Sequence, residues 1–285
     1  MSKIQKPIIK WVGGKTQLLD TILKKFPKKI NNYHETFIGG ASILFGLLHL
    51  KSMNQIEIEG NIFAYDLNER LIHLYNYIKN EKQQLYLQIF KYFHDYDKKE
   101  PDDKEAFYYK CRDDFNTLEK NNIKSSALFV FLNKTGFRGV YRENSKGKFN
   151  VPYGHYKKTP KFMSKEQFYK LSDLIQCVTF MCLSFKESLK KAVDGDFIYL
   201  DPPYAPENNT SFTKYNKAGF TIDDNKELFN TIKNMKNVKF LMSNANVELV
   251  QNSFQEYTKK EVTARRAIHR DNPGKTTTEL LIQNY

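Results

Sequence analysis

One short segment constrains this chain more than any other: a strand-like apolar run followed at once by an acid, two prolines and a tyrosine. Residues 196–200 read Asp-Phe-Ile-Tyr-Leu, which is typical of a buried strand, and Asp201-Pro-Pro-Tyr204 follows. Two prolines stop a strand because they lack the N–H that a sheet requires. In open α/β sheets ligands bind at the carboxyl ends of strands. The segment therefore predicts a site where an acid, backbone carbonyls and an aromatic ring hold a flat amine.

The chain before this segment has the pattern of a mononucleotide-binding α/β half. A strand expected over 33–37 leads through a glycine turn into an apolar helix over 43–50, and a second strand over 61–65 ends at Asp66. The α/β pattern resumes after the middle of the chain. There we expect a helix near 224–235 and strands at 177–183, 238–242, 257–264 and 277–284, the last two as an antiparallel pair.

The middle of the chain has a different character. Helical periodicity dominates its first part, and a stretch dense in Lys, Arg and aromatic residues follows, with a turn at Asn144–Gly147 between two strand-like arms. We therefore expect a catalytic domain built from 1–66 and 176–285. Residues 67–175 are expected to form an inserted, mainly helical domain that carries a β-hairpin over 136–153.

Charge and hydropathy narrow the classes of protein. The 285 residues carry a formal net charge of +13, which favours a polyanionic partner such as nucleic acid, although a codon bias towards Lys, Asn and Ile gives the same excess. The longest apolar run, over 43–50, is too short to span a bilayer, and residues 1–7 have no leader pattern, so a cytoplasmic location is expected. The three cysteines are expected to be small buried thiols, because Cys177 and Cys182 have no nearby histidine for a zinc site.

The glycine turn and the acid after it indicate the kind of cofactor. The turn over 37–40 lacks the third glycine of the dinucleotide fingerprint, so it suits a nucleoside cofactor that needs only a close backbone approach. Asp66 is placed to accept hydrogen bonds from ribose hydroxyls. Its alternative role is to cap the helix that follows.

Two residues near the start of the chain leave two interpretations each. Trp11 is the single tryptophan; it is either a core aromatic or a ring that packs on a cationic sulfonium or an adenine face. Lys15 is either a solvated lysine at a helix start, where a positive charge is unfavourable, or the partner of a carboxylate. That carboxylate would belong to the cofactor or to Asp201.

Together these motifs resemble Dam-type DNA adenine-N6 methyltransferases, the D12 class in its α arrangement. Lys10–Lys15 looks like the first cofactor motif of that family, Glu35–Gly40 its glycine motif, and Asp201–Tyr204 its catalytic motif. The resemblance covers nearly the whole chain and extends to Glu279-Leu-Leu. One departure is Thr36, which replaces the usual proline and is expected to loosen the turn slightly.

The resemblance implies a Rossmann-like methyltransferase fold, a mixed seven-stranded sheet with an antiparallel terminal pair. It also implies S-adenosyl-L-methionine as methyl donor, no metal, and a catalytic role for Asp201, Pro202 and Tyr204. Asp201 and the Pro202 carbonyl would accept the two N–H bonds of adenine N6, and Tyr204 would stack on an adenine flipped out of the duplex. The implied cofactor-binding residues are Trp11, Lys15, Phe37, Gly39, Asp66 and Asp201.

Recognition of double-stranded DNA is implied for the hairpin region, with a GATC-type target. Arg142 would contact a guanine with two hydrogen bonds, and Phe137 and Arg138 would enter the stack left by the flipped base. The remaining implied recognition residues are Lys10 and Tyr156, which would contact the first guanine, and Pro152, which would pack on a thymine methyl. The alternatives are a core position for Phe137 and simple phosphate contacts for the basic residues.

Other functions stay open at this stage. An RNA adenine or protein amide methyltransferase would share the cofactor motifs, although such enzymes more often carry Asn in place of Asp201. A catalytically silent DNA-binding relative would share the fold. The sequence predicts no membrane partner, and it leaves open whether the enzyme acts beside a separate cognate restriction endonuclease.

Overall fold

The computed structural model describes residues 4–206, 220–265 and 276–285. The chain divides into two compact units. The first unit consists of Met1–Gly14, Gly39–Ala41 and Asn68–Cys182. The second unit consists of Lys15–Ile38, Ser42–Leu67 and Leu183–Tyr285.

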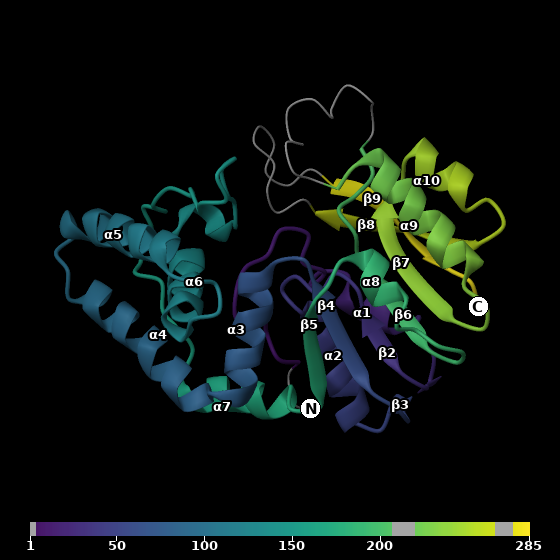
Figure 1. Cartoon of the computed structure of the whole chain (residues 1–285), viewed down its shortest axis with the longest axis horizontal. Coiled ribbons are helices and arrows are strands. Elements are labelled where there is room, and N and C mark those ends of the chain that lie inside the picture. Colours follow the sequence, from purple (N-terminus) through teal and green to yellow (C-terminus); the bar gives the residue numbers. More distant parts are fainter. Residues whose placement is uncertain (1–3, 207–219, 266–275) are drawn as a thin grey trace. The chain divides into compact units, whose positions relative to one another are not determined.

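The larger sheet has seven strands in the order β5-β4-β2-β6-β7-β9-β8 (Figure 1). Its strands are β2 (Tyr33–Glu35), β4 (Ile62–Asp66), β5 (Val178–Cys182), β6 (Phe197–Leu200), β7 (Lys239–Ala245), β8 (Thr258–Arg265) and β9 (Thr276–Gln283). Strands β4, β2, β6 and β7 pair in parallel, whereas β9 is antiparallel to both β7 and β8. The expected mixed sheet with an antiparallel terminal pair is confirmed.

Helices of the second unit cover its sheet with apolar faces. They are α1 (Leu19–Leu23), α2 (Ser42–Ser52), α8 (Phe185–Leu189), α9 (Ile222–Asn234) and α10 (Glu248–Ser253). One core cluster joins residues of α8, α9 and α10 to β6, β7 and β9, among them Phe185, Leu228 and Met242. Gly46 lets α1 pack closely on α2: a Cβ at this position would lie 2.6 Å from Leu23 Cδ1, so the leucine side chain would have to shift.

A second, two-stranded parallel sheet was not predicted from the sequence. Its strands are β1 (Lys29–Ile30) and β3 (Glu57–Ile58). Each has only two residues, which is too few for an alternating pattern to show.

The first unit is mainly helical. Its helices are α3 (Glu69–Asn80), α4 (Lys82–Asp97), α5 (Asp103–Thr117), α6 (Ile123–Thr135) and α7 (Lys165–Leu174), with a short 3-10 turn, η1 (Phe137–Gly139). Ten of the thirteen residues of α6 are buried, so this helix is the centre around which the unit packs. After it, two antiparallel bridges, Gly136 with Tyr153 and Glu143 with Phe149, join two arms. The turn between these arms includes Gly147 at φ +69°, a left-handed conformation that glycine adopts without strain.

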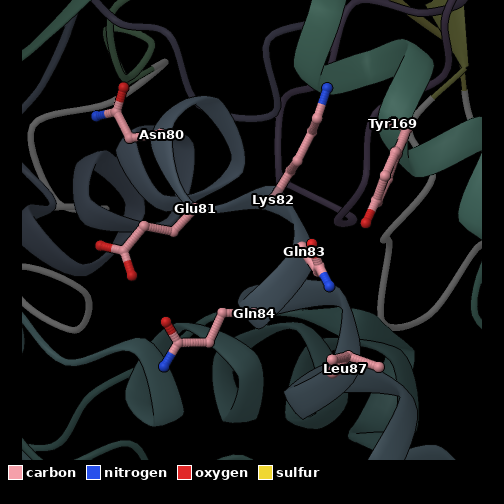
Figure 2. A pocket seen from close by; sticks show the side chains of 7 residues that line it. All are labelled: Asn80, Glu81, Lys82, Gln83, Gln84, Leu87 and Tyr169. Carbon is pink, nitrogen blue, oxygen red and sulfur yellow. The ribbon is translucent and has the colours of Figure 1, made fainter.

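Figure 2 shows a surface hollow in the first unit. It is lined by Asn80, Glu81, Lys82, Gln83, Gln84, Leu87 and Tyr169. Lys82 forms an ion pair with Asp173 at 2.5 Å, and its ammonium lies 5.1 Å from the centre of the Tyr169 ring. These contacts join α4 to α7. None of the site residues predicted from the sequence lies here.

The cysteines only partly follow the expectation of buried thiols. Cys111 is buried in α5, but Cys177 and Cys182 are exposed. The expectation was wrong for these two because Cys177 lies just before β5 and Cys182 is its last residue, and the core covers neither position. Among the residues that the structure describes, no helix is long and apolar enough to cross a membrane.

A buried polar cluster lies where β6 begins. The Asp196 carboxylate accepts hydrogen bonds from the backbone N–H groups of Asn32 and Val193, and His34 Nε2 lies 3.0 Å from Asp196 Oδ2. His34 Nδ1 is 3.0 Å from the Tyr65 hydroxyl. Since the carboxylate can only accept, Nε2 carries the proton and Nδ1 accepts from Tyr65.

This cluster predicts a loss of stability in acid. Burial lowers the pKa of His34 below its ordinary 6.5, although Asp196 opposes the shift. The unfolded chain therefore binds a proton at a higher pH than the folded chain, and stability is lost as the pH falls below about 6.5. In His34→Gln, whose amide can donate to Asp196 and accept from Tyr65, the melting temperature should fall less between pH 7.5 and 5.5. The exposed His94→Gln is the control; a slope unchanged in His34→Gln would contradict this role.

Candidate active site

The centre of the second unit is an ion pair at the end of β6. Asp201 directly follows the strand, and its Oδ2 lies 2.7 Å from Lys15 Nζ. The side chains are only 17% and 5% exposed, so the pair is largely removed from water. Lys15 is therefore not the solvated helix-start lysine of the alternative interpretation, and its backbone N–H donates to Ser42 Oγ at 3.2 Å.

The second carboxylate oxygen of Asp201 is the most informative atom of the site. Oδ1 is buried and has no hydrogen-bond partner among the residues that the structure describes. Leaving a buried acceptor unsatisfied costs about 1–3 kcal/mol, more for a charged group. Because Lys15 fixes Oδ2, Oδ1 is an acceptor available for an N–H group that none of the described residues supplies.

Burial sets the acidity of Asp201. It raises the pKa of this carboxyl to about 6, even though Lys15 pulls the pKa down. The Glu279 carboxylate raises the pKa and the Tyr204 hydroxyl lowers it. At neutral pH the group is mostly ionised, which suits an acceptor of N–H bonds.

Tyr204 is held on two sides. Its hydroxyl donates to Glu279 Oε2 at 2.7 Å, and its ring centre lies 4.9 Å from Lys15 Nζ. On one side of Tyr204, Pro202 is buried and Pro203 is exposed. On the other side, Ala205 donates its N–H to Asn244 Oδ1 at 3.2 Å. These contacts fix the segment after β6 on both the sheet and the hairpin β8–β9.

A second buried acid lies on the neighbouring strand. Glu35 of β2 is paired in register with Tyr199 of β6 and accepts a hydrogen bond from the Tyr33 hydroxyl at 2.7 Å. Burial raises the pKa of Glu35 to about 8, Tyr33 opposes this rise, and the charge of Asp201 adds to it. Glu35 is therefore mostly neutral at pH 7 and adds little negative charge beside Asp201.

The position where proline was expected gains a hydrogen bond. The Thr36 N–H donates to the Tyr199 carbonyl at 3.2 Å, a bond that proline cannot make. The turn is thus tied to β6 at this residue.

Two further residues of the second unit were expected to bind a cofactor. The Phe37 ring stacks on Phe185 at a centroid distance of 6.4 Å and meets Phe220 edge-on at 5.8 Å. Asp66 ends β4 and is half-buried. The alternative role of Asp66 as helix cap is wrong, because the Asn68 side chain caps α3 by accepting from the Leu71 N–H at 3.0 Å.

Trp11 and Gly39 lie together in the first unit. The Trp11 ring stacks on Tyr141 at 5.6 Å and meets Phe129 edge-on at 6.2 Å. A Cβ at Gly39 would lie 2.6 Å from Trp11 Cδ1, and Gly39 has φ +46°. The glycine is therefore required twice, by the left-handed backbone and by the close approach of the indole.

Four of the predicted DNA-recognition residues form two pairs in the first unit. The Lys10 ammonium lies 5.6 Å from the Tyr156 ring centre. The Arg138 guanidinium lies 5.2 Å from the Phe137 ring centre, and Arg138 has φ +55°, a strained conformation for a residue other than glycine. Phe137 is 45% exposed, so the alternative that it belongs to the core is wrong.

Arg142 is exposed but held in place. Its Nε donates to Asn150 Oδ1 at 2.8 Å and its Nη2 to the Asn150 carbonyl at 3.2 Å. These bonds leave N–H groups at the end of the guanidinium to contact another molecule. Pro152, also exposed, accepts a hydrogen bond from the Phe137 N–H through its carbonyl at 2.8 Å.

Comparison with known proteins identifies the class to which this geometry belongs. Residues 11–268 match the model of the D12 class N6 adenine-specific DNA methyltransferases. The chain belongs to this family, and it is a DNA adenine methyltransferase with a Rossmann-like methyltransferase fold.

Its relatives are similar over almost their full length. The chain is 37% identical to the type II methyltransferase M.MjaIII of Methanocaldococcus jannaschii over 294 residues, which cover 98% of this chain and 99% of that protein. It is 32% identical to the type II methyltransferase M1.LlaDCHI of Lactococcus lactis, over 98% and 95% of the two chains. It is 30% identical to the DNA adenine methylase of Escherichia coli K12, over 99% and 96%.

The second unit offers groups that suit the methyl donor of this family, S-adenosyl-L-methionine. The fit rests on the aromatic face of Phe37 and on the acid at the end of β4, Asp66. Among the residues that the structure describes, no group of three or more His, Cys, Asp or Glu side chains could hold a metal ion.

The Lys15–Asp201 pair predicts how activity depends on pH. The single-turnover rate of methyl transfer should fall in acid around pH 6, as Asp201 takes up a proton and loses its acceptor character. Lys15→Met removes the charge that lowers the pKa, so the acid limb should move to higher pH. Retention of folding is checked by melting temperature, and an acid limb that stays in place in Lys15→Met would contradict the coupling.

Proposed function

We propose that this chain is a site-specific methyltransferase that modifies adenine N6 in duplex DNA, within GATC, with S-adenosyl-L-methionine as methyl donor. The observation that carries the proposal is the acceptor at Asp201: Lys15 fixes one oxygen, and the other is buried without a partner in the described parts of the chain. An exocyclic amine is the kind of ligand that supplies the missing N–H.

The proposed mechanism uses the chain's own acceptors. Adenine N6 is a poor nucleophile because its lone pair is delocalised into the ring. Asp201 Oδ1 accepts one N–H and the carbonyl of the buried Pro202 accepts the other, which draws the nitrogen towards a tetrahedral geometry and localises the lone pair. The cofactor, when bound, supplies an electrophilic methyl group. The proposed cofactor residues are Trp11, Lys15, Phe37, Gly39, Asp66 and Asp201.

We further propose that the target adenine is flipped out of the helix. Acceptors that are buried at a strand end cannot reach a base inside a duplex. Flipping the adenine out of the duplex costs on the order of a few kcal/mol, because the base loses its stacking and pairing. Tyr204 offsets part of this cost by stacking, typically about 1–3 kcal/mol per base. Its hydroxyl bond to Glu279 supports this role because it holds the ring in one place.

The proposed target-recognition domain is 67–175, with its hairpin over 136–153. Support comes from the exposed aromatic–cation pair Phe137 and Arg138 and from the ordered guanidinium of Arg142. An arginine held by a neighbouring side chain loses less freedom when it contacts guanine O6 and N7. The proposed recognition residues are Lys10, Phe137, Arg138, Arg142, Pro152 and Tyr156.

Transfer of a tritiated methyl group to duplex oligonucleotides tests the reaction. Label should enter a GATC duplex, and much less should enter a duplex with the same composition in scrambled order. Asp201→Ala should abolish transfer while it keeps measurable DNA affinity, because the carboxylate acts on the amine and not on the phosphate backbone. Label on RNA but not on DNA, or wild-type turnover in Asp201→Ala, would overturn the proposal.

Arg142→Ala tests sequence recognition. If Arg142 contacts a guanine through two hydrogen bonds, the variant should lose preference at one base pair by about 1–3 kcal/mol and keep it at the others. Methylation rates on four duplexes that differ at that pair give the measurement. Lys148→Ala, a loss of positive charge on the opposite arm of the same hairpin, is the control and should weaken binding to all duplexes alike. The same uniform weakening in Arg142→Ala would assign this arginine to phosphate.

A further inference from the structure

We propose that Glu279 is a positioning residue for the reaction: through the Tyr204 hydroxyl it holds the ring that lies against Lys15. This inference rests on the proposed function and adds a residue from outside the strand-end motif. It comes from β9, the antiparallel strand between β7 and β8.

The contacts form a chain of four side chains. Asp201 Oδ2 is 2.7 Å from Lys15 Nζ, and Lys15 Nζ is 4.9 Å from the Tyr204 ring centre. The Tyr204 hydroxyl is 2.7 Å from Glu279 Oε2. Burial, together with the charges of Asp201 and Glu279, raises the pKa of Tyr204 far above its ordinary value, so the hydroxyl always has a proton to donate.

Tyr204 has few other means of keeping one orientation. It lies beyond the end of β6, in a segment without regular secondary structure, and it is half-buried. Glu279 stands on a strand that pairs with β7 at Ala245 and with β8 at Val262, so its backbone is fixed on both sides. A hydrogen bond to an ionised acceptor from such a rigid strand is stronger than a neutral one and fixes the ring plane.

The same carboxylate acts on Asp201 through its charge. Lys15 and Tyr204 favour the ionised form of Asp201. The other groups that interact with it electrostatically are Glu35 on the neighbouring strand β2, Tyr199 on β6 itself and Glu279 on β9. Among these, Lys15 and Glu279 oppose each other directly: the first lowers the pKa of Asp201 and the second raises it. Glu279 thus keeps the carboxylate more basic, and a better acceptor, than the ion pair alone would leave it.

Two substitutions separate charge from position. Glu279→Gln removes the charge but keeps an oxygen that can accept from Tyr204. Glu279→Ala removes both. Glu261→Gln is the matched control, because Glu261 lies on β8 of the same hairpin, is exposed, and contacts Asn246 instead. Melting temperatures of all variants show whether the fold is retained.

The first measurement needs no DNA and no turnover. Carboxyl carbon-13 NMR of selectively labelled aspartate, assigned with Asp201→Asn, gives the titration midpoint of Asp201 directly. The midpoint should lie near pH 6 in the wild type, move to lower pH in Glu279→Gln, and stay in place in Glu261→Gln. A midpoint unchanged or raised in Glu279→Gln would overturn the electrostatic part.

The second measurement tests position. Glu279→Ala should slow single-turnover methyl transfer by roughly 10- to 100-fold with little change in the affinity for DNA, the effect of losing one charge-assisted bond. Tyr204→Phe should cost about the same, and the double variant no more than either single one. Additive losses, or a wild-type rate in Glu279→Ala, would overturn the positioning role. If the wild type itself labels no DNA, the proposed function fails while the NMR result still decides the coupling.

Discussion

The site depends on one desolvated ion pair, Lys15 with Asp201. A buried carboxylate without a partner would take up a proton, and a buried lysine without one would lose its own. Pairing keeps both charged, and it consumes only one of the two carboxylate oxygens. Two features of the fold support this pair. Strand β6 ends just before the prolines, which places the acid at the carboxyl end of a central strand, and Glu35 on the neighbouring strand stays mostly neutral. The other oxygen, without a partner in the described parts of the chain, is the acceptor on which the proposed reaction depends.

Much of the sheet could be predicted because its strands follow simple rules. β6 and β7 are short apolar runs bounded by turn residues, and the final pair, β8 and β9, lies close together in sequence. The strand-end acid Asp201 was therefore placed correctly from local pattern alone. Asp201 was one of two carboxylates considered as the partner of Lys15, and the other was that of the cofactor. The sequence shows that a lysine is unfavourable at a helix start, but it does not show which carboxylate the lysine contacts.

The part that could not be predicted depends on tertiary pairing. Glu279 lies 75 residues after Tyr204 in the chain. The hydrogen bond that it accepts from the Tyr204 hydroxyl forms only because β9 pairs with β7. The sequence shows it only within a trio of residues similar to the family. The cap of α3 was expected, as one alternative, at Asp66, but it is the Asn68 side chain that reaches the Leu71 N–H. Two-residue strands such as β1 carry no periodic signal at all.

The close contact between Gly39 and Trp11 has an evolutionary consequence. Every other amino acid at position 39 would place its Cβ 2.6 Å from the indole, so the glycine cannot change while the tryptophan stays. A smaller residue at position 11, 28 residues earlier in the chain, would remove this clash but not the left-handed backbone at position 39. A combinatorial library that varies both positions at once should therefore still recover glycine at position 39.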